Sequence, residues 1–137
     1  MTKETHLAVS ATLEGAPYET HVAIRHHGLR LDEPVEQGGQ DLGPKPHELL
    51  CTSLAACTAI TVRMYVDRKQ LPVRKVTVTC TMDRKADGGA VDTSFHLAVH
   101  VDGDLTDEQR QRVLQIANMC PVHRTLTNPL RITSALA

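Results

Sequence analysis

The stretch GPKPHELLCTSLAACTAITVRMYVDRK, from Gly43 to Lys69, decides the fold of this chain because it holds the longest uncharged run in the sequence. No charge interrupts residues 49–62. The two prolines near its start stop a helix from extending further back, so the sequence predicts a helix at residues 47–68, about 33 Å long. Fourteen uncharged residues are fewer than the roughly 20 that a bilayer span needs.

Apolar residues surround this predicted helix instead of forming one stripe, so we expect it to be buried on most sides. They are Leu49, Leu50, Leu54, Ile60, Val62, Met64 and Val66. Small residues around Cys57 would let another helix approach closely, which places this sulfur in a tight, mostly apolar seam. A buried free cysteine is often no more than a small hydrophobe, so the position alone does not make Cys57 reactive.

Composition points to one domain, residues 1–137, that needs a partner subunit. The chain has one Phe, two Tyr and no Trp, so aliphatic side chains or a second copy must supply the bulk that rings usually provide. A net charge of −1 means that the chain has no excess of positive charge to attract nucleic acid or anionic lipid. We therefore expect a homodimer that binds neither nucleic acid nor membrane.

The N-terminus, MTKETHLAVS, lacks the pattern of a signal or transit peptide, which predicts a cytoplasmic protein with reduced thiols. Four cysteines in that compartment favour catalysis, redox sensing or metal binding over structural bridges. The absence of a CxxC pair weakens the case for zinc.

Alternating apolar residues on both sides of the helix predict two antiparallel β-hairpins and an α+β fold. Thr106 and Gln109 form a capping box, and Pro121 suits the first turn of a short helix. Cys80 occupies an inward position of its strand and is interpreted as a core residue. The predicted elements are strands at 7–13, 18–24 and 29–31, a loop at 33–46, the helix at 47–68, strands at 76–82 and 95–101, a helix opened by the capping box, a short helix at 121–127 and a strand at 130–135.

Cys57 and Cys120 are the thiols whose meeting is worth testing. Cys51 is a poor partner for Cys57, because six helical residues separate their side chains by about 120° around the helix and about 9 Å along it. Cys120 precedes Pro121 at a helix boundary, where backbone amides point towards its sulfur. A zinc site from Cys120 and His123 would lack enough clustered ligands, and no residue is identifiable to orient the base of a Cys/His acyl-transfer enzyme.

The segments PHELLCTSLAACTAITVRMY, LPVRKVTVT and IANMCPVH, with the GG-D-GP-P lead-in, resemble the OsmC/Ohr family of thiol peroxidases and its OsmC-like branch. The resemblance covers most of the chain from Asp32 onward. It implies an OsmC-like fold, an intertwined homodimer with antiparallel sheets wrapped around two central helices. It also implies reduction of hydroperoxides, often organic ones, with a dithiol reductant and no cofactor.

The resemblance gives each cysteine a role: Cys57 is the peroxidatic thiol, oxidised to a sulfenic acid, and Cys120 resolves it as a disulfide. The family also places an arginine and a glutamate near the first cysteine. The family's glutamate position, ten residues before that cysteine, is His47 here, with Glu48 one residue later.

Arg25 and Arg30 are the candidates for the arginine. We expect Arg25 to pair with the Cys57 thiolate and to lower the pKa of that thiol below about 8.5. A non-enzymatic redox sensor, or a dimer that binds a small apolar ligand, is the alternative on the same fold.

Overall fold

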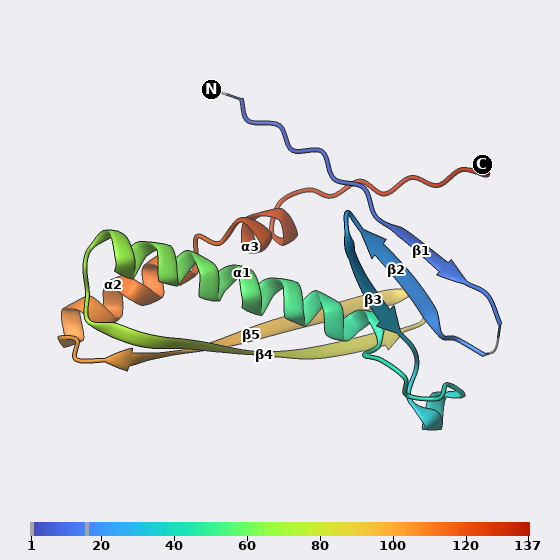
Figure 1. Ribbon diagram of the computed structural model, residues 1–137, viewed down its shortest axis with the longest axis horizontal. Coiled ribbons are helices and arrows are strands. Elements are labelled where there is room, and N and C mark those ends of the chain that lie inside the picture. Colours follow the sequence, from blue (N-terminus) through green and yellow to red (C-terminus); the bar gives the residue numbers. More distant parts are fainter. Residues whose placement is uncertain (1, 16) are drawn as a thin grey trace. The chain divides into compact units, whose positions relative to one another are not determined.

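The structure of the protein is a computed structural model that describes residues 2–15 and 17–137 (Figure 1). It comprises two compact units, the first ending at Leu49 and the second running from Leu50 to Ala137. In the described part of the chain there are two antiparallel sheets, three α-helices and one short 3-10 helix. The predicted α+β class is confirmed. The two units are described one after the other.

The first unit holds a three-stranded antiparallel sheet in the order β1-β2-β3. Its strands are β1 (Ser10–Leu13), β2 (Thr20–Ile24) and β3 (His27–Leu31). They confirm the three predicted strands, although β1 is shorter than expected. The turn between β2 and β3 lies at residues 25–26, so β3 begins two residues earlier than predicted, and Arg25 adopts a φ of 55° in the turn.

The loop after β3 is ordered around one buried carboxylate. Asp32 is only 2% exposed, and its side chain accepts backbone N–H hydrogen bonds from Glu33 at 2.7 Å, Leu42 at 3.2 Å and Gln40 at 3.3 Å. The loop includes the 3-10 helix η1 (Val35–Gln37). Burial by itself would raise the pKa of Asp32, but the three N–H donors and the positive charge of Arg30 outweigh it and lower the pKa.

We expect Asp32→Asn to loosen this loop, because an amide cannot accept as many N–H bonds as a carboxylate. The folded pKa of Asp32 is depressed, so its contribution is complete above the unfolded pKa of about 3.9 and is lost as pH falls through the folded value. Hydrogen exchange at the amides of Gln40 and Leu42 measures the effect. Asp41→Asn is the control, since Asn tolerates the φ of 54° at Asp41. Unchanged exchange in Asp32→Asn would contradict the prediction.

The central helix α1 spans Pro46–Arg68, which confirms the helix predicted for residues 47–68. Its first residue is a proline, whose missing N–H costs nothing there. The Glu48 carboxylate accepts a hydrogen bond from the Lys45 backbone N–H at 2.9 Å, so this side chain caps the start of α1. By length and mean hydropathy α1 would qualify as a membrane span, a test that the core helix of a soluble protein also passes.

The second unit contains a long hairpin of β4 (Val73–Asp87) and β5 (Ala90–Gly103). Its turn contains Gly88 and Gly89, whose φ values of 56° and 96° suit glycine. Both strands are longer than predicted, but the predicted inward faces are paired with each other. The pairs are Val76 with Val101, Val78 with Val99, Cys80 with Leu97 and Met82 with Phe95.

Two helices follow the hairpin: α2 (Asp107–Ala117) and α3 (Pro121–Leu126). The predicted capping box is present, with Thr106 and Gln109 each bonded to the other's backbone N–H. The apolar core of the second unit joins α1, β5 and α2 through Val62, Val66, Val101, Leu105, Val113 and Ala117. This arrangement, with α1 lying along the β4–β5 hairpin, is visible in Figure 1.

The predicted last strand at residues 130–135 is wrong: these residues form no strand in the described chain. A strand needs a neighbouring edge for its backbone hydrogen bonds, and this segment pairs with neither sheet. Leu130 and Ile132 are 57% and 90% exposed. Their alternating pattern therefore predicted an element that a single chain does not form.

The chain buries one stripe of α1 and leaves another side of it open. Leu54, Thr58, Val62 and Val66 are buried at a spacing of four residues. Ile60 and Met64, in contrast, are 55% and 65% exposed. The expectation that α1 is buried on most sides is wrong for the single chain, because the chain's own hairpin and helices cover only part of the apolar surface of α1.

Candidate active site

The second unit brings Cys57 and Cys120 together. Cys57 lies in the middle of α1, and Cys120 is the N-cap residue of α3. Each of the two thiols shifts the pKa of the other, so Cys57 and Cys120 are neighbours. Two neighbouring thiols on two helices form a dithiol, the arrangement from which a disulfide can be made.

Cys120 is held at the start of α3 by backbone donors. Its sulfur accepts the His123 N–H at 3.3 Å, and Pro121 fills the first helical position. Burial, which is complete at 0% exposure, would raise the pKa of Cys120. The hydrogen bond from the His123 amide, with the nearby Cys57 thiol, Thr58 hydroxyl and Val122 amide, outweighs burial and lowers the pKa of Cys120.

Cys57 is half-buried, and its surroundings act in the opposite direction. Burial raises the pKa of Cys57, and the neighbouring Cys120 raises it further, against the opposing influence of the Val122 N–H and the Thr61 hydroxyl. The sequence predicted a lowered pKa for Cys57, whereas the residues of the second unit raise it. The opposite directions of the two shifts favour the first negative charge of the pair on Cys120 rather than on Cys57.

The other predicted site residues, Arg25 and Glu48, belong to the first unit. Arg25 lies in the β2–β3 turn, and Glu48 caps α1 through Lys45. Arg30, the other arginine candidate, forms an ion pair with Glu19 at 3.4 Å. The structure gives Glu48 a helix-capping role, and the proximity of Arg25 or Glu48 to Cys57 remains a prediction.

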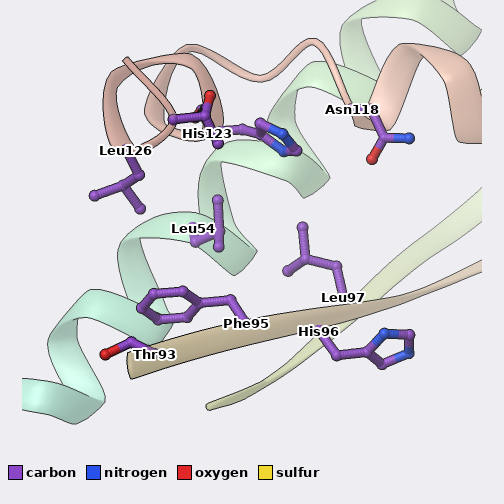
Figure 2. Close-up of a pocket in the computed structure, with 9 residues that line it drawn as sticks. Leu54, Thr93, Phe95, His96, Leu97, Asn118, His123 and Leu126 are labelled. Atoms are coloured by element: carbon purple, nitrogen blue, oxygen red, sulfur yellow. Dashed lines mark hydrogen bonds between the residues drawn. The ribbon is translucent and has the colours of Figure 1, made fainter. Parts of the chain in front are cut away.

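A cavity of about 600 Å³ lies among residues of the second unit, and His123, whose backbone N–H donates to the Cys120 sulfur, is one of its lining residues (Figure 2). Figure 2 shows Leu54 on α1 facing Phe95 and Leu97 on β5, with His123 and Leu126 of α3 along another wall. The remaining lining residues are Thr93, His96, Asn118 and Thr127. His123 connects this cavity to the thiols, because its backbone N–H donates to the Cys120 sulfur.

Two features of the site escaped the sequence analysis. The Val122 N–H lowers the pKa of both thiols, and the Thr58 hydroxyl, which donates to the Leu54 carbonyl oxygen at 2.8 Å, lowers the pKa of Cys120. The C-P-V-H segment could have indicated Val122. Proline marks the first position of a helix, and the amides of the first turn of a helix have no partners within the helix. No spacing rule pointed to Thr58, because its contact with Cys120 depends on how α1 meets α3.

Metal binding finds no support in the side-chain arrangement. Among residues 2–15 and 17–137, no group of three or more His, Cys, Asp or Glu side chains could hold a metal ion. The site, as far as it is described, is a dithiol next to a largely apolar cavity.

Comparison with known proteins identifies the family. The family of OsmC-like proteins matches residues 38–135, so the chain belongs to the OsmC-like family. The match includes α1, the β4–β5 hairpin, α2 and α3, and with them both cysteines of the candidate site. No curated protein matches the chain.

Solved structures share the fold at low sequence identity. A protein of Psychrobacter arcticus 273-4, provisionally named an osmotic stress induced and detoxification response protein, is 22% identical with a TM-score of 0.75 over 91% of each chain. An organic hydroperoxide resistance protein from Elizabethkingia anophelis, with thiocyanate bound, is 19% identical with a TM-score of 0.73, covering 93% of this chain and 91% of its own. The organic hydroperoxide resistance protein OsmC from Legionella pneumophila is 18% identical with a TM-score of 0.71 over 92% of each chain. At these identities the likeness establishes the fold.

Proposed function

We propose that this protein is a thiol peroxidase that reduces hydroperoxides with the Cys57/Cys120 pair. The observation that carries the proposal is that the two thiols are neighbours, with the Cys120 sulfur accepting a backbone N–H from His123 and its pKa lowered. Two relatives of the same fold are named organic hydroperoxide resistance proteins, which agrees with this chemistry.

In the proposed reaction the Cys57 sulfur attacks the terminal oxygen of a hydroperoxide, the O–O bond breaks, and the alcohol leaves with a proton. Cys57 becomes a sulfenic acid. The Cys120 thiolate then attacks the Cys57 sulfur, displaces hydroxide, which leaves as water, and completes a disulfide. A dithiol reductant exchanges with this disulfide and restores both thiols.

Exposure and charge assign the two roles. Cys57 is half-buried and Cys120 is fully buried, so a hydroperoxide reaches Cys57 more easily. The lowered pKa of Cys120 supplies a thiolate that is ready to resolve the sulfenic acid. That thiolate is also a neighbouring base for the Cys57 proton.

Hydroperoxide consumption by the purified protein, with a dithiol as electron donor, tests the proposal. Repeated turnover that depends on the dithiol is expected. One disulfide formed per chain without continued consumption would instead favour the non-enzymatic redox sensor, and no reaction at either cysteine would overturn both functions.

The raised pKa of Cys57 in the second unit means that an efficient peroxidase needs a positive charge from elsewhere in the protein. We propose Arg25 for this role, because arginine stays protonated and donates several hydrogen bonds to a thiolate and to the leaving alkoxide. Glu48, beyond capping α1, would orient that arginine. Both assignments rest on the family resemblance and on the need for a cation.

Arg25→Ala should raise the pKa of Cys57, since removing a nearby positive charge disfavours the thiolate. The measurement is a pH titration of thiolate absorbance in a Cys120→Ser background, which leaves Cys57 without its coupled partner. Arg30→Ala is the matched control, because Arg30 already pairs with Glu19. An equal pKa with and without Arg25 would remove this residue from the mechanism.

Bulky alkyl hydroperoxides should react faster than hydrogen peroxide. Leu54, Phe95 and Leu97 line the cavity beside the thiols, and each buried methylene contributes about 0.8 kcal/mol, or nearly fourfold in the second-order rate constant. Stopped-flow rates with both substrates measure the preference. Leu126→Asn, which makes one wall of the cavity polar, should reduce the rate with the alkyl substrate and spare hydrogen peroxide. Equal rate constants in the parent protein would refute the prediction.

We also propose that the protein is a homodimer in which a second copy covers the open side of α1. Ile60 and Met64 follow Cys57 by three and seven residues, so all three share one face of the helix. The two apolar side chains are 55% and 65% exposed in the single chain. A partner on this face would bury them, complete the apolar surroundings of Cys57 and restrict the access of water to its sulfur.

A further inference from the structure

The open side of α1 borders a groove of about 500 Å³ in the second unit, between the second half of the helix and the start of β4. The apolar residues that line this groove are Ala59, Ile60, Met64 and Val76, and the cationic ones are Arg63, Arg74 and Lys75. Ile60 and Met64 are the exposed residues that a second copy covers in the proposed homodimer. The groove is therefore continuous with the proposed interface.

Lys75 is the cation of this groove that has no anion beside it. Arg63 is paired with Asp67 at 3.1 Å, and Arg74 is paired with Asp102 at 2.7 Å. In the described part of the chain, no carboxylate lies within ion-pair distance of Lys75. An apolar groove with an ammonium group on its rim is complementary to a surface that carries an apolar side chain beside carboxylates.

The loop between β3 and α1 has such a surface. Residues 32–44 contain four carboxylates and no Lys, Arg or His. Three of the carboxylates are exposed or half-buried, those of Glu33, Glu36 and Asp41, and none of them has an ion-pair partner within the described residues. Val35, which lies between two of them in η1, is 67% exposed. This loop follows β3 in the first unit (Figure 1).

The loop is held in a fixed shape, which lowers the entropy cost of docking it. The buried Asp32 carboxylate accepts three of its backbone N–H groups. A Cβ at Gly39 would collide with the Glu33 carbonyl oxygen, and one at Gly43 would collide with the Arg30 carbonyl oxygen. The backbone therefore packs closely at two points, and the loop presents its apolar and acidic side chains on an ordered surface.

We propose that the loop at residues 32–44 of a second copy docks in this groove, with the partner's Val35 on the apolar floor and the partner's Glu36 beside Lys75. The inference rests on the proposed homodimer and adds the segment that the partner contributes. In a two-fold symmetric dimer the contact occurs twice, because each chain has one loop and one groove. Exposed ion pairs contribute little affinity, so the apolar side chains supply the attraction and the charges select the partner segment.

Charge reversal in two separate chains tests this inference. Lys75→Glu would face the partner's carboxylates, and Glu36→Lys would face the partner's cations, so each homodimer should weaken by roughly tenfold in Kd. When the two variants are mixed, opposite charges meet at both contacts of the mixed dimer. With a tenfold loss in each homodimer, about 90% of the dimers in an equal mixture should be mixed, against about 50% for two mass-tagged native chains. Native mass spectrometry after subunit exchange measures this fraction.

Lys85→Glu is the matched control for Lys75→Glu. Both lysines are exposed on β4, and each pairs across the hairpin with an aspartate, Asp92 for Lys85 and Asp102 for Lys75. Lys85→Glu mixed with Glu36→Lys should give only the statistical half of mixed dimers. Dimers that form from Lys75→Glu and Glu36→Lys in the statistical proportion would overturn the docking of the loop and leave the homodimer standing. A monomeric native protein would overturn the homodimer itself.

Discussion

Replacing Cys57 by serine should abolish hydroperoxide consumption, with a loss of roughly a thousandfold or more in kcat/KM, because an alcohol at neutral pH does not replace a thiol as a nucleophile toward oxygen. A serine hydroxyl is harder to ionise than the Cys57 thiol, even though the pKa of that thiol is raised, so the serine variant should not retain activity. A dithiol-coupled assay with an alkyl hydroperoxide measures the effect.

Cys120→Ser should lose repeated turnover but keep the first reaction with hydroperoxide. The first chemical step remains, so about one equivalent of hydroperoxide should be consumed per chain, and a sulfenic acid should accumulate on Cys57, where a dimedone-type reagent traps it. Sustained turnover in Cys120→Ser at the native rate, or a trapped sulfenic acid on Cys120 in the native protein, would reverse the two roles.

The remaining thiols provide the matched controls. Cys51→Ser and Cys80→Ser should keep nearly native peroxidase activity, because the contacts of Cys57 and Cys120 are with each other and with residues of α1 and α3. An essential Cys80 would show that the roles assigned to Cys57 and Cys120 are wrong.

Met64→Asp should convert the proposed dimer into a monomer. In the dimer this side chain would be surrounded by apolar groups of the partner, and a carboxylate there would lose its hydration without gaining a cation. The side chain is 65% exposed in the single chain, so the folded monomer should tolerate the charge. Light scattering or sedimentation at micromolar concentration gives the mass, and circular dichroism checks that the monomer is folded.

Gln111→Asp is the control, because it adds the same charge at an exposed position of α2. It should leave the mass unchanged. A native protein that is already monomeric at micromolar concentration would contradict the proposed dimer, and a Met64→Asp variant that stays dimeric would place the interface on another face.

Local patterns carried most of the prediction of the fold. The prolines before α1, the capping box of α2 and the alternation in β4 and β5 act over a few residues, and each is present where the sequence placed it. The strand at residues 130–135 failed because a strand also depends on a distant edge, which alternation does not reveal. The expected burial of α1 failed for a similar reason: the apolar residues of α1 indicate a buried helix, but they do not show whether the same chain or a partner covers them.

The candidate site was predictable only in part. The position of Cys120 before Pro121 indicated backbone amides near its sulfur, and the His123 N–H does donate to it. The pKa values were not predictable in the same way, because they depend on contacts between elements far apart in the sequence. The pKa is lowered at Cys120 and raised at Cys57, whereas the role of nucleophile predicted the lowered pKa at Cys57.

The N-cap role of Cys120 links its oxidation state to the folding of α3. Its sulfur accepts an amide of the first turn, and a thiolate does so far better than a neutral sulfur. The six residues of α3 are too few to be stable without such support. A disulfide between Cys57 and Cys120 would remove the negative charge from this cap and loosen the helix that carries His123 and Leu126. The wall of the cavity that α3 supplies should then be better ordered in the reduced protein than in the oxidised one.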